Sequence, residues 1–119
     1  MSSNYTPQDL MDLMEKFALA AVDAANKYVP VKENLIMLED KRKIVFAGIC
    51  ERIDAKTTAE KERVALQTSD WTSYTDGYIQ AQKDDLRAST DKENNKMLYE
   101  LYRSMLSARK TEMNTIDRQ

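Results

Sequence analysis

The chain of 119 residues contains no histidine, and it has only one cysteine, two glycines and two prolines. Without histidine, Ser-His-Asp and Cys-His catalysis and histidine-ligated zinc are excluded. Cys50 alone cannot form an internal disulfide, which fits a reducing compartment. Gly48 and Gly77 stand apart, so the chain has no glycine-rich loop to hold a phosphate. We therefore expect a protein that is not an enzyme and that needs no metal and no cofactor.

Turn-forming residues are too scarce for a strand-rich fold. Sandwiches, barrels and doubly wound sheets need a turn signal every ten residues or so, and two glycines with two prolines do not supply them. Hydrophobic residues make up 42% of the chain and charged residues 32%, a mixture typical of soluble helices. The length suits one small domain. The composition predicts a single all-α domain over residues 1–119.

Long apolar runs are also missing. No segment approaches the roughly 20 apolar residues that span a membrane. Residues 1–4, Met-Ser-Ser-Asn, show neither the basic region nor the apolar core of a signal peptide. We expect no membrane partner and a cytoplasmic location, which would be the host cytoplasm if a phage encodes the chain.

Apolar residues recur at helical spacing along the first half of the chain. Thr6 and Pro7 are a typical N-cap and first helical residue, so an amphipathic helix is predicted from about residue 6 to residue 29. Pro30 disfavours helical geometry at the preceding Val29, which predicts the end of this helix. A second helix is expected from about residue 31 to residue 56, with Gly48 permitting a close approach of another helix.

Thr57 and Glu60 form the clearest helix start in the chain, a capping box. A long helix is predicted from about residue 58 to residue 116. Its sequence becomes polar between residues 87 and 96, where either a continuous helix with a kink near 87–95 or a break near 89–91 would fit; we favour continuity. The short connection before it predicts a helical hairpin.

Aromatic and aliphatic residues follow a seven-residue rhythm on this long helix. Such a seam packs against a core or a partner helix, although aromatic side chains can also stack on nucleic-acid bases. Because an elongated hairpin buries its apolar stripes poorly by itself, we expect a homo-oligomer. The candidate seam residues are Trp71, Tyr74, Tyr78, Tyr99, Tyr102 and Leu106.

Positive charge is concentrated in one segment, although the net charge of the whole chain is −2. Residues 41–63 hold seven basic and four acidic residues, a net charge of +3. Folding of the hairpin would gather these bases around its turn, either as a solvated face of i,i+4 ion pairs or as a nucleic-acid-binding patch. The candidate binding residues are Lys41, Arg42, Lys43, Arg52, Lys56, Lys61 and Arg63.

Two segments together resemble a known family. Residues 55–65 read Ala-Lys-Thr-Thr-Ala-Glu-Lys-Glu-Arg-Val-Ala, and residues 103–113 read Arg-Ser-Met-Leu-Ser-Ala-Arg-Lys-Thr-Glu-Met. This pair, on a long helix, is similar to small helical phage recombination accessory proteins of the UvsY type, over about residues 31–116. The resemblance implies a ring-like oligomer that binds single-stranded DNA and helps load a recombinase onto strands coated by single-strand-binding protein. It also implies DNA contacts at the hairpin, by position Lys56, Lys61 and Arg63 with Arg52 beside them.

Two functions of different classes follow from the sequence. The first is a non-enzymatic recombination or repair accessory protein that binds single-stranded DNA. The second is a protein-only interaction module, such as a phage adaptor, an assembly chaperone or an inhibitor of a host protein. The net acidity and the seven methionines favour the second function, because methionine-rich surfaces adapt to varied partners.

Overall fold

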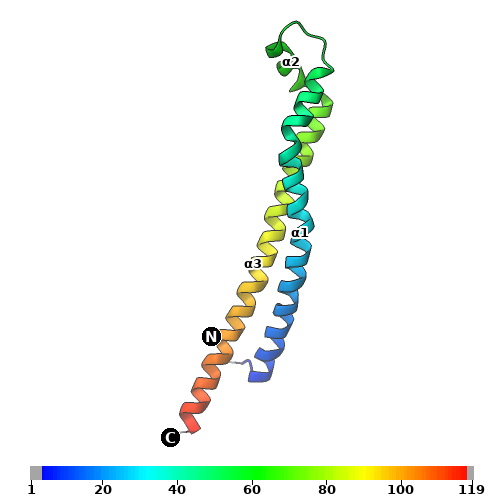
Figure 1. The fold of residues 1–119 in the computed structure, drawn as a ribbon. Coiled ribbons are helices and arrows are strands. Elements are labelled where there is room, and N and C mark those ends of the chain that lie inside the picture. The colour runs from blue at the N-terminus through cyan, green and yellow to red at the C-terminus, as the bar shows by residue number, and fades with distance from the viewer. Residues whose placement is uncertain (1–3, 118–119) are drawn as a thin grey trace. The chain divides into compact units, whose positions relative to one another are not determined.

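The computed structural model describes residues 4–117, with side chains for residues 4–113, and this part of the chain is helical without any strand. It contains α1 (Pro7–Glu51), α2 (Thr58–Ala65) and α3 (Ser69–Asp117) (Figure 1). The prediction of an all-α chain with a helical hairpin and a long C-terminal helix is confirmed. Among the described residues, no helix is long and apolar enough to cross a membrane.

The start of α1 follows the predicted cap. The Thr6 hydroxyl accepts a hydrogen bond from the Asp9 amide at 3.1 Å, and the Asp9 carboxylate accepts one from the Thr6 amide at 3.0 Å. Two backbone donors that the helix leaves without partners are thereby satisfied. The pKa of the Asp9 carboxyl is lowered chiefly by the hydrogen bond from the Thr6 amide, and the Thr6 hydroxyl adds to this effect.

The predicted break at Val29–Pro30 is wrong, because α1 continues through Pro30 to Glu51. A proline inside a helix removes one backbone hydrogen bond and costs about 3 kcal/mol. The carbonyl that loses its donor is that of Asn26, an exposed residue one turn earlier, so water can reach it. Packing of α1 against α3 before and after the proline offsets the remaining cost. The helix therefore continues although proline disfavours it locally.

The next boundaries also differ from those predicted. α1 ends at Glu51 rather than near residue 56, because the amides of Arg52 and Ile53 bond to carbonyls three residues back, at 3.2 and 3.1 Å. Gly48 meets no neighbouring atom within 4 Å of a Cβ position, so no second helix approaches it closely. Thr57 does cap α2, where its hydroxyl accepts from the Glu60 amide at 3.1 Å.

The predicted helix over residues 58–116 is two helices. The chain leaves the helix after Ala65, and Thr68 starts the next one: its hydroxyl donates to the Ala65 carbonyl at 2.8 Å and accepts from the Trp71 amide at 3.2 Å. From Ser69 onward α3 is uninterrupted, and it passes through the polar residues 87–96 as the favoured alternative predicted.

Where one domain was predicted, the chain divides into two compact units, each of which pairs part of α1 with part of α3. The terminal unit comprises the residues up to 28 and those from 88 onward. In it, Phe17 stacks on Tyr102 with ring centroids 5.7 Å apart, and Tyr5 meets the same ring edge-on at 6.1 Å. Leu10 and Leu106 are buried.

The turn unit comprises residues 29–87 and contains α2. Its core cluster is formed by Ile49, Ala65 and Trp71. Farther along the paired helices, the Tyr78 hydroxyl donates to Glu39 at 3.0 Å, and Lys32 lies 3.9 Å from Asp85. These contacts set the antiparallel register of α1 and α3 within the unit.

Candidate nucleic-acid interface

A groove lies in the turn unit between the last turns of α1, the short helix α2 and the first turn of α3. Its volume is about 580 Å³. The groove is lined by apolar side chains and by the stems and heads of charged ones. The lining residues are Arg42, Lys43, Phe46, Ala47, Cys50, Glu51, Thr58, Lys61, Glu62, Leu66 and Trp71.

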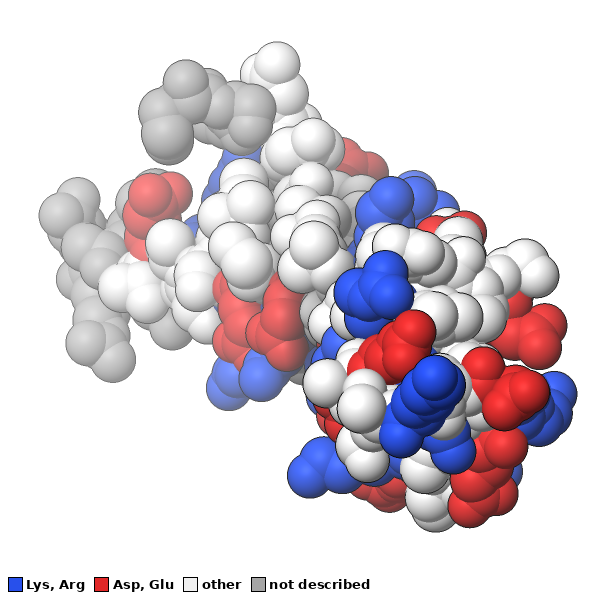
Figure 2. Space-filling model, turned by 90° about the horizontal axis from the view of Figure 1, so that it is seen from above, with Lys and Arg blue, Asp and Glu red and all other residues white. Residues whose placement is uncertain are grey.

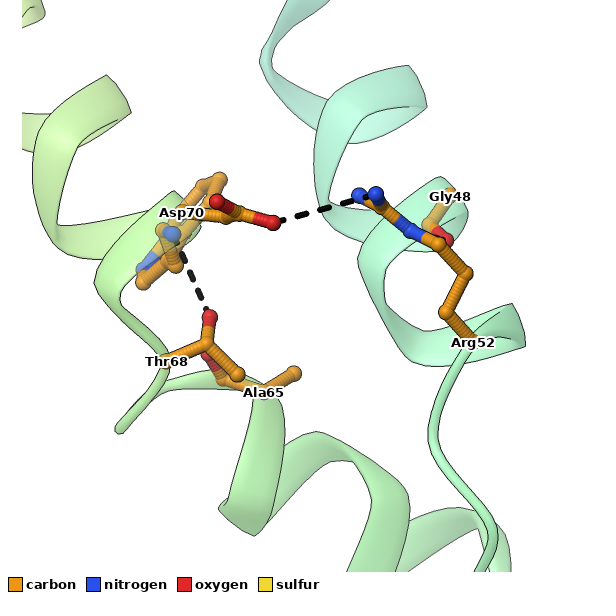
Figure 3. Close-up of polar contacts among 6 residues, drawn as sticks. Gly48, Arg52, Ala65, Thr68 and Asp70 are labelled. Carbon is orange, nitrogen blue, oxygen red and sulfur yellow. Dashed lines mark hydrogen bonds and ion pairs between the residues drawn. The ribbon is translucent and has the colours of Figure 1, made fainter.

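The groove exists because α2 folds back at the end of the α1–α3 pair. Ala65 is fully buried in the core cluster, which anchors the last turn of α2. The Thr68 hydroxyl then redirects the chain into α3 (Figure 3). This placement brings Lys61 of α2 to the same groove as Lys43 of α1, which lies eighteen positions earlier in the sequence.

Aromatic rings form one wall of the groove. Phe46 and Trp71 meet edge to face with centroids 4.9 Å apart, and Trp71 stacks on Tyr74 at 5.6 Å. Trp71 is only 9% exposed, so most of the indole supports the core and only its remaining surface faces the groove. The groove therefore offers an apolar surface that is fixed in place by the packing beneath it.

Three of the seven predicted basic residues line the groove, namely Arg42, Lys43 and Lys61. The guanidinium of Arg42 lies 5.9 Å from the Trp71 ring and 5.6 Å from the Tyr78 ring, within cation–π range. Two carboxylates, Glu51 and Glu62, share the lining, so its cations outnumber its anions by one.

Arg52 is directed elsewhere. Its Nε donates to the Gly48 carbonyl at 3.3 Å, and its guanidinium lies 3.7 Å from the Asp70 carboxylate (Figure 3). Both ionic side chains are about two-thirds exposed, so this pair contributes at most about 1 kcal/mol. Arg52 joins the ends of α1 and α3 and does not line the groove.

The remaining predicted bases are exposed and lie outside the lining of the groove: Lys41, Lys56 and Arg63. Viewed from the end of the turn unit, lysine and arginine side chains alternate with aspartate and glutamate side chains (Figure 2). On the face seen in this view, the basic side chains are interspersed with acidic ones and do not form one continuous basic surface.

The six candidate seam residues lie within the pairing of α1 with α3. In the turn unit, Trp71 is buried, and the hydroxyls of Tyr74 and Tyr78 donate to the Leu38 carbonyl and to Glu39. In the terminal unit, Tyr99 and Tyr102 are half-buried and Leu106 is buried.

The phenol of Tyr78 has a raised pKa. Loss of solvent between the helices is the largest cause, and the hydrogen bond to the Glu39 carboxylate adds to it, while the charge of Arg42 opposes the shift. Tyr78 therefore stays protonated and keeps donating to Glu39. This bond holds the helices together beside the groove.

Sequence reasoning missed Phe46, Leu66 and Thr68. The cluster Thr68-Ser69-Asp70 is itself a typical helix start and could have signalled the second break. In the sequence, Phe46 and Leu66 belong to ordinary apolar runs, and only the position of α2 brings them to one groove. Within the described part of the chain, no group of cysteine and carboxylate side chains could hold a metal ion.

No protein-family model, curated protein or solved structure matches this chain.

Proposed function

We propose that the chain is a non-enzymatic accessory protein that binds single-stranded DNA in the groove of the turn unit. The observation that carries this proposal is the combination of an apolar, aromatic-walled groove with Arg42, Lys43 and Lys61 in its lining. The resemblance to recombination mediators suggests the setting, which is assistance to a recombinase on strands coated by single-strand-binding protein.

The aromatic wall of the groove suits the base of a nucleotide, and the basic side chains of its lining suit the phosphate. Unpaired bases gain about 1–3 kcal/mol each from aromatic surface, a contact that paired bases in a duplex cannot make. Lysine and arginine side chains neutralise phosphates and release counterions. A groove of about 580 Å³ has room for a few unpaired bases.

The carboxylates nearby limit how strongly one groove can bind. Glu51 and Glu62 repel phosphate within the groove itself, and the chain carries a net charge of −2. Binding by one copy should therefore be weak and salt-sensitive. Several copies on one strand would raise the apparent affinity, because each further groove binds a strand that is already held nearby.

A matched pair of double variants tests the site. Lys43→Ala/Lys61→Ala removes two charges from the groove, and Lys56→Ala/Arg63→Ala removes two charges from exposed positions outside it. We expect the first variant to weaken binding of a labelled single-stranded oligonucleotide at least tenfold. It should also reduce the slope of log K against log salt by about 0.7 for each phosphate that the protein no longer neutralises.

The control variant should lose less than threefold in affinity, because its two residues lie outside the groove. Both variants have the same net charge, so the comparison isolates the position of the charges. Circular dichroism and melting curves establish that both retain the helical fold. Equal losses in the two variants would show that general electrostatics, and not the groove, controls binding. An unchanged affinity of the groove variant would contradict the proposed site.

A protein-only interaction module is the second candidate, and a specific observation favours it. Large apolar side chains are exposed along both long helices, among them Leu19, Ile44 and Leu86 at 65–72% exposure. Exposed apolar surface of this extent is typical of protein contact sites. Stoichiometric recovery of a different protein from nuclease-treated extract, without DNA binding at low salt, would support this alternative.

A further inference from the structure

The exposed apolar residues of α1 in the turn unit share one face. At 3.6 residues per turn, they fall within about 100° of arc, and the buried Leu35 and Ile49 lie about half a turn away, toward α3. Because α1 carries apolar side chains on two opposite sides, we expect a second surface to pack on the side that α3 does not cover. The exposed residues of this face are Val29, Ile36, Met37 and Ile44.

α3 repeats this arrangement in the turn unit. Ile79 and Leu86 are exposed, seven residues apart and therefore on one face, whereas Trp71 and Ala81 turn toward α1. The paired helices thus present one apolar face on α1, about half a turn from its buried residues, and another on α3, about a third of a turn from the side that packs on α1. We name these the outer α1 face and the outer α3 face.

Taken by itself, the terminal unit also has an exposed apolar face on each helix. On α1, Met11, Leu19 and Val22 are exposed within about 80° of arc, and on α3, Met97 and Leu101 are exposed one turn apart. The buried Leu10 and Leu106 lie on the opposite sides of their helices.

The outer faces match each other in position along the helices. In the turn unit, the contacts of Tyr78 with Glu39 and of Lys32 with Asp85 set residues 79–86 of α3 alongside residues 32–38 of α1. Ile79 thus lies at the level of Met37, within the apolar part of the outer α1 face.

The terminal unit shows the same correspondence. The contacts of Phe17 with Tyr102 and of Tyr28 with Lys92 bring Leu101 to the level of Leu19 and Met97 to the level of Val22. In each unit, apolar residues of one outer face therefore stand at the height of apolar residues of the other.

The charges on the two faces are complementary as well. In the turn unit, helical spacing places Glu33 and Asp40 among the apolar residues of the outer α1 face. It places Lys83, Arg87 and Asp76 within the same width of arc as Ile79 and Leu86 on the outer α3 face. Lys83 lies at the level of Glu33 in the same antiparallel register.

Between Val29 and Ile44 the outer α1 face thus carries a net charge of −2, and the outer α3 face carries +1 from Lys83, Arg87 and Asp76. A contact between two α1 faces or two α3 faces brings like net charges together, whereas an α1–α3 contact brings opposite ones together.

We propose that the outer α1 face binds the outer α3 face of a second copy of this chain, with the two helices antiparallel and level with each other. The contact would repeat outside the molecule the pairing that α1 and α3 make inside it. Because the two faces are different surfaces, each copy keeps one face open after pairing, and association continues until the assembly closes.

Lysine substitutions on each face separate this arrangement from others. Val22→Lys/Ile36→Lys disrupts the outer α1 face in both units, and Ile79→Lys/Met97→Lys disrupts the outer α3 face. The control Asn34→Lys/Ser73→Lys adds two charges at exposed positions that lie on neither face. The measurement is mass by size-exclusion chromatography with light scattering, at about 50 µM in moderate salt.

The wild-type chain and the control should have masses well above the 13.7 kDa of one copy, and each face variant alone should have the mass of one copy. An equimolar mixture of the two face variants should give a dimer, because each supplies the face that the other lacks. A mixture that stays monomeric would overturn the pairing of unlike faces.

A monomeric wild-type chain would overturn the proposal entirely and leave the outer faces to a different protein. A second measurement does not depend on how well the two face variants fold, because it changes only charged residues at exposed positions. Glu33→Lys should weaken self-association, and Lys83→Glu in the same chain should restore it. DNA binding by the groove is measured separately, so either proposal can fail while the other stands.

Discussion

Trp71 links the core of the turn unit to the groove. It packs on Phe46 and Tyr74, supports the guanidinium of Arg42 and is 9% exposed. Replacing Trp71 by Ala should therefore lower the free energy of unfolding by about 3–5 kcal/mol, as for other buried aromatic residues. Urea unfolding followed by circular dichroism measures this loss, and a loss below about 1 kcal/mol would contradict the packing.

Asp9 provides a prediction on pH. Its pKa is lowered in the folded chain by the bonds from Thr6, so its contribution to stability is present above the ordinary value of about 3.9 and is lost as the pH falls through the lowered value. NMR titration of the Asp9 side chain should give a midpoint below 3.9. In Thr6→Ala, which loses the hydroxyl, the midpoint should move upward, and an unchanged midpoint would contradict the cap.

Among the helices, α1 shows how far local signals determine structure. Its start at Thr6–Pro7 was predicted correctly, because capping chemistry lies within four residues. Its passage through Pro30 was not, because the packing that offsets the proline comes from α3, more than fifty residues later in the sequence. Thr68 is a different case: its capping chemistry is local, but the strong seven-residue periodicity of this region favoured an uninterrupted helix.

Pro30→Ala tests this explanation of α1. Since Pro30 is exposed within the helix, the substitution restores a backbone donor without disturbing a core. We expect an increase in the free energy of unfolding of about 1–3 kcal/mol. Thermal melting of the two proteins provides the comparison, and a destabilised Pro30→Ala variant would mean that the proline has a packing role.

Gly48→Ala makes a related prediction at the other end of α1. An added Cβ meets nothing within 4 Å, and the Gly48 carbonyl that accepts from Arg52 is unaffected. The gain in helix propensity should stabilise the chain by about 1 kcal/mol. A loss of stability in the melting curve would mean that a helix does approach closely at this position.

At the scale of the whole molecule, the candidate site was only partly predictable. The sequence located an excess of basic residues over 41–63, and all seven lie in the turn unit. It did not distinguish Lys43 and Lys61, which line the groove, from Lys56 and Arg63, which do not. That distinction depends on the direction of α2, which is set by Ala65 and Thr68 and has no periodic signature.

The outer faces explain why the chain combines a small core with many exposed apolar residues. The buried hydrophobic residues of the described part are few, and several exposed ones recur every seven residues on the outer faces of α1 and α3. Self-association through these faces would place one groove on every copy. Binding to a long single strand should then be multivalent and stronger than binding to a strand that fills one groove.

The most direct test of the central claim is fluorescence anisotropy of a labelled single-stranded oligonucleotide, titrated with the full chain at low and moderate salt. A duplex of the same length serves as the comparison. We expect saturable binding that weakens steeply with salt and that favours the single strand. Absence of binding at low salt, by protein shown to be helical and intact, would contradict the DNA-binding function and leave a protein that acts only on other proteins.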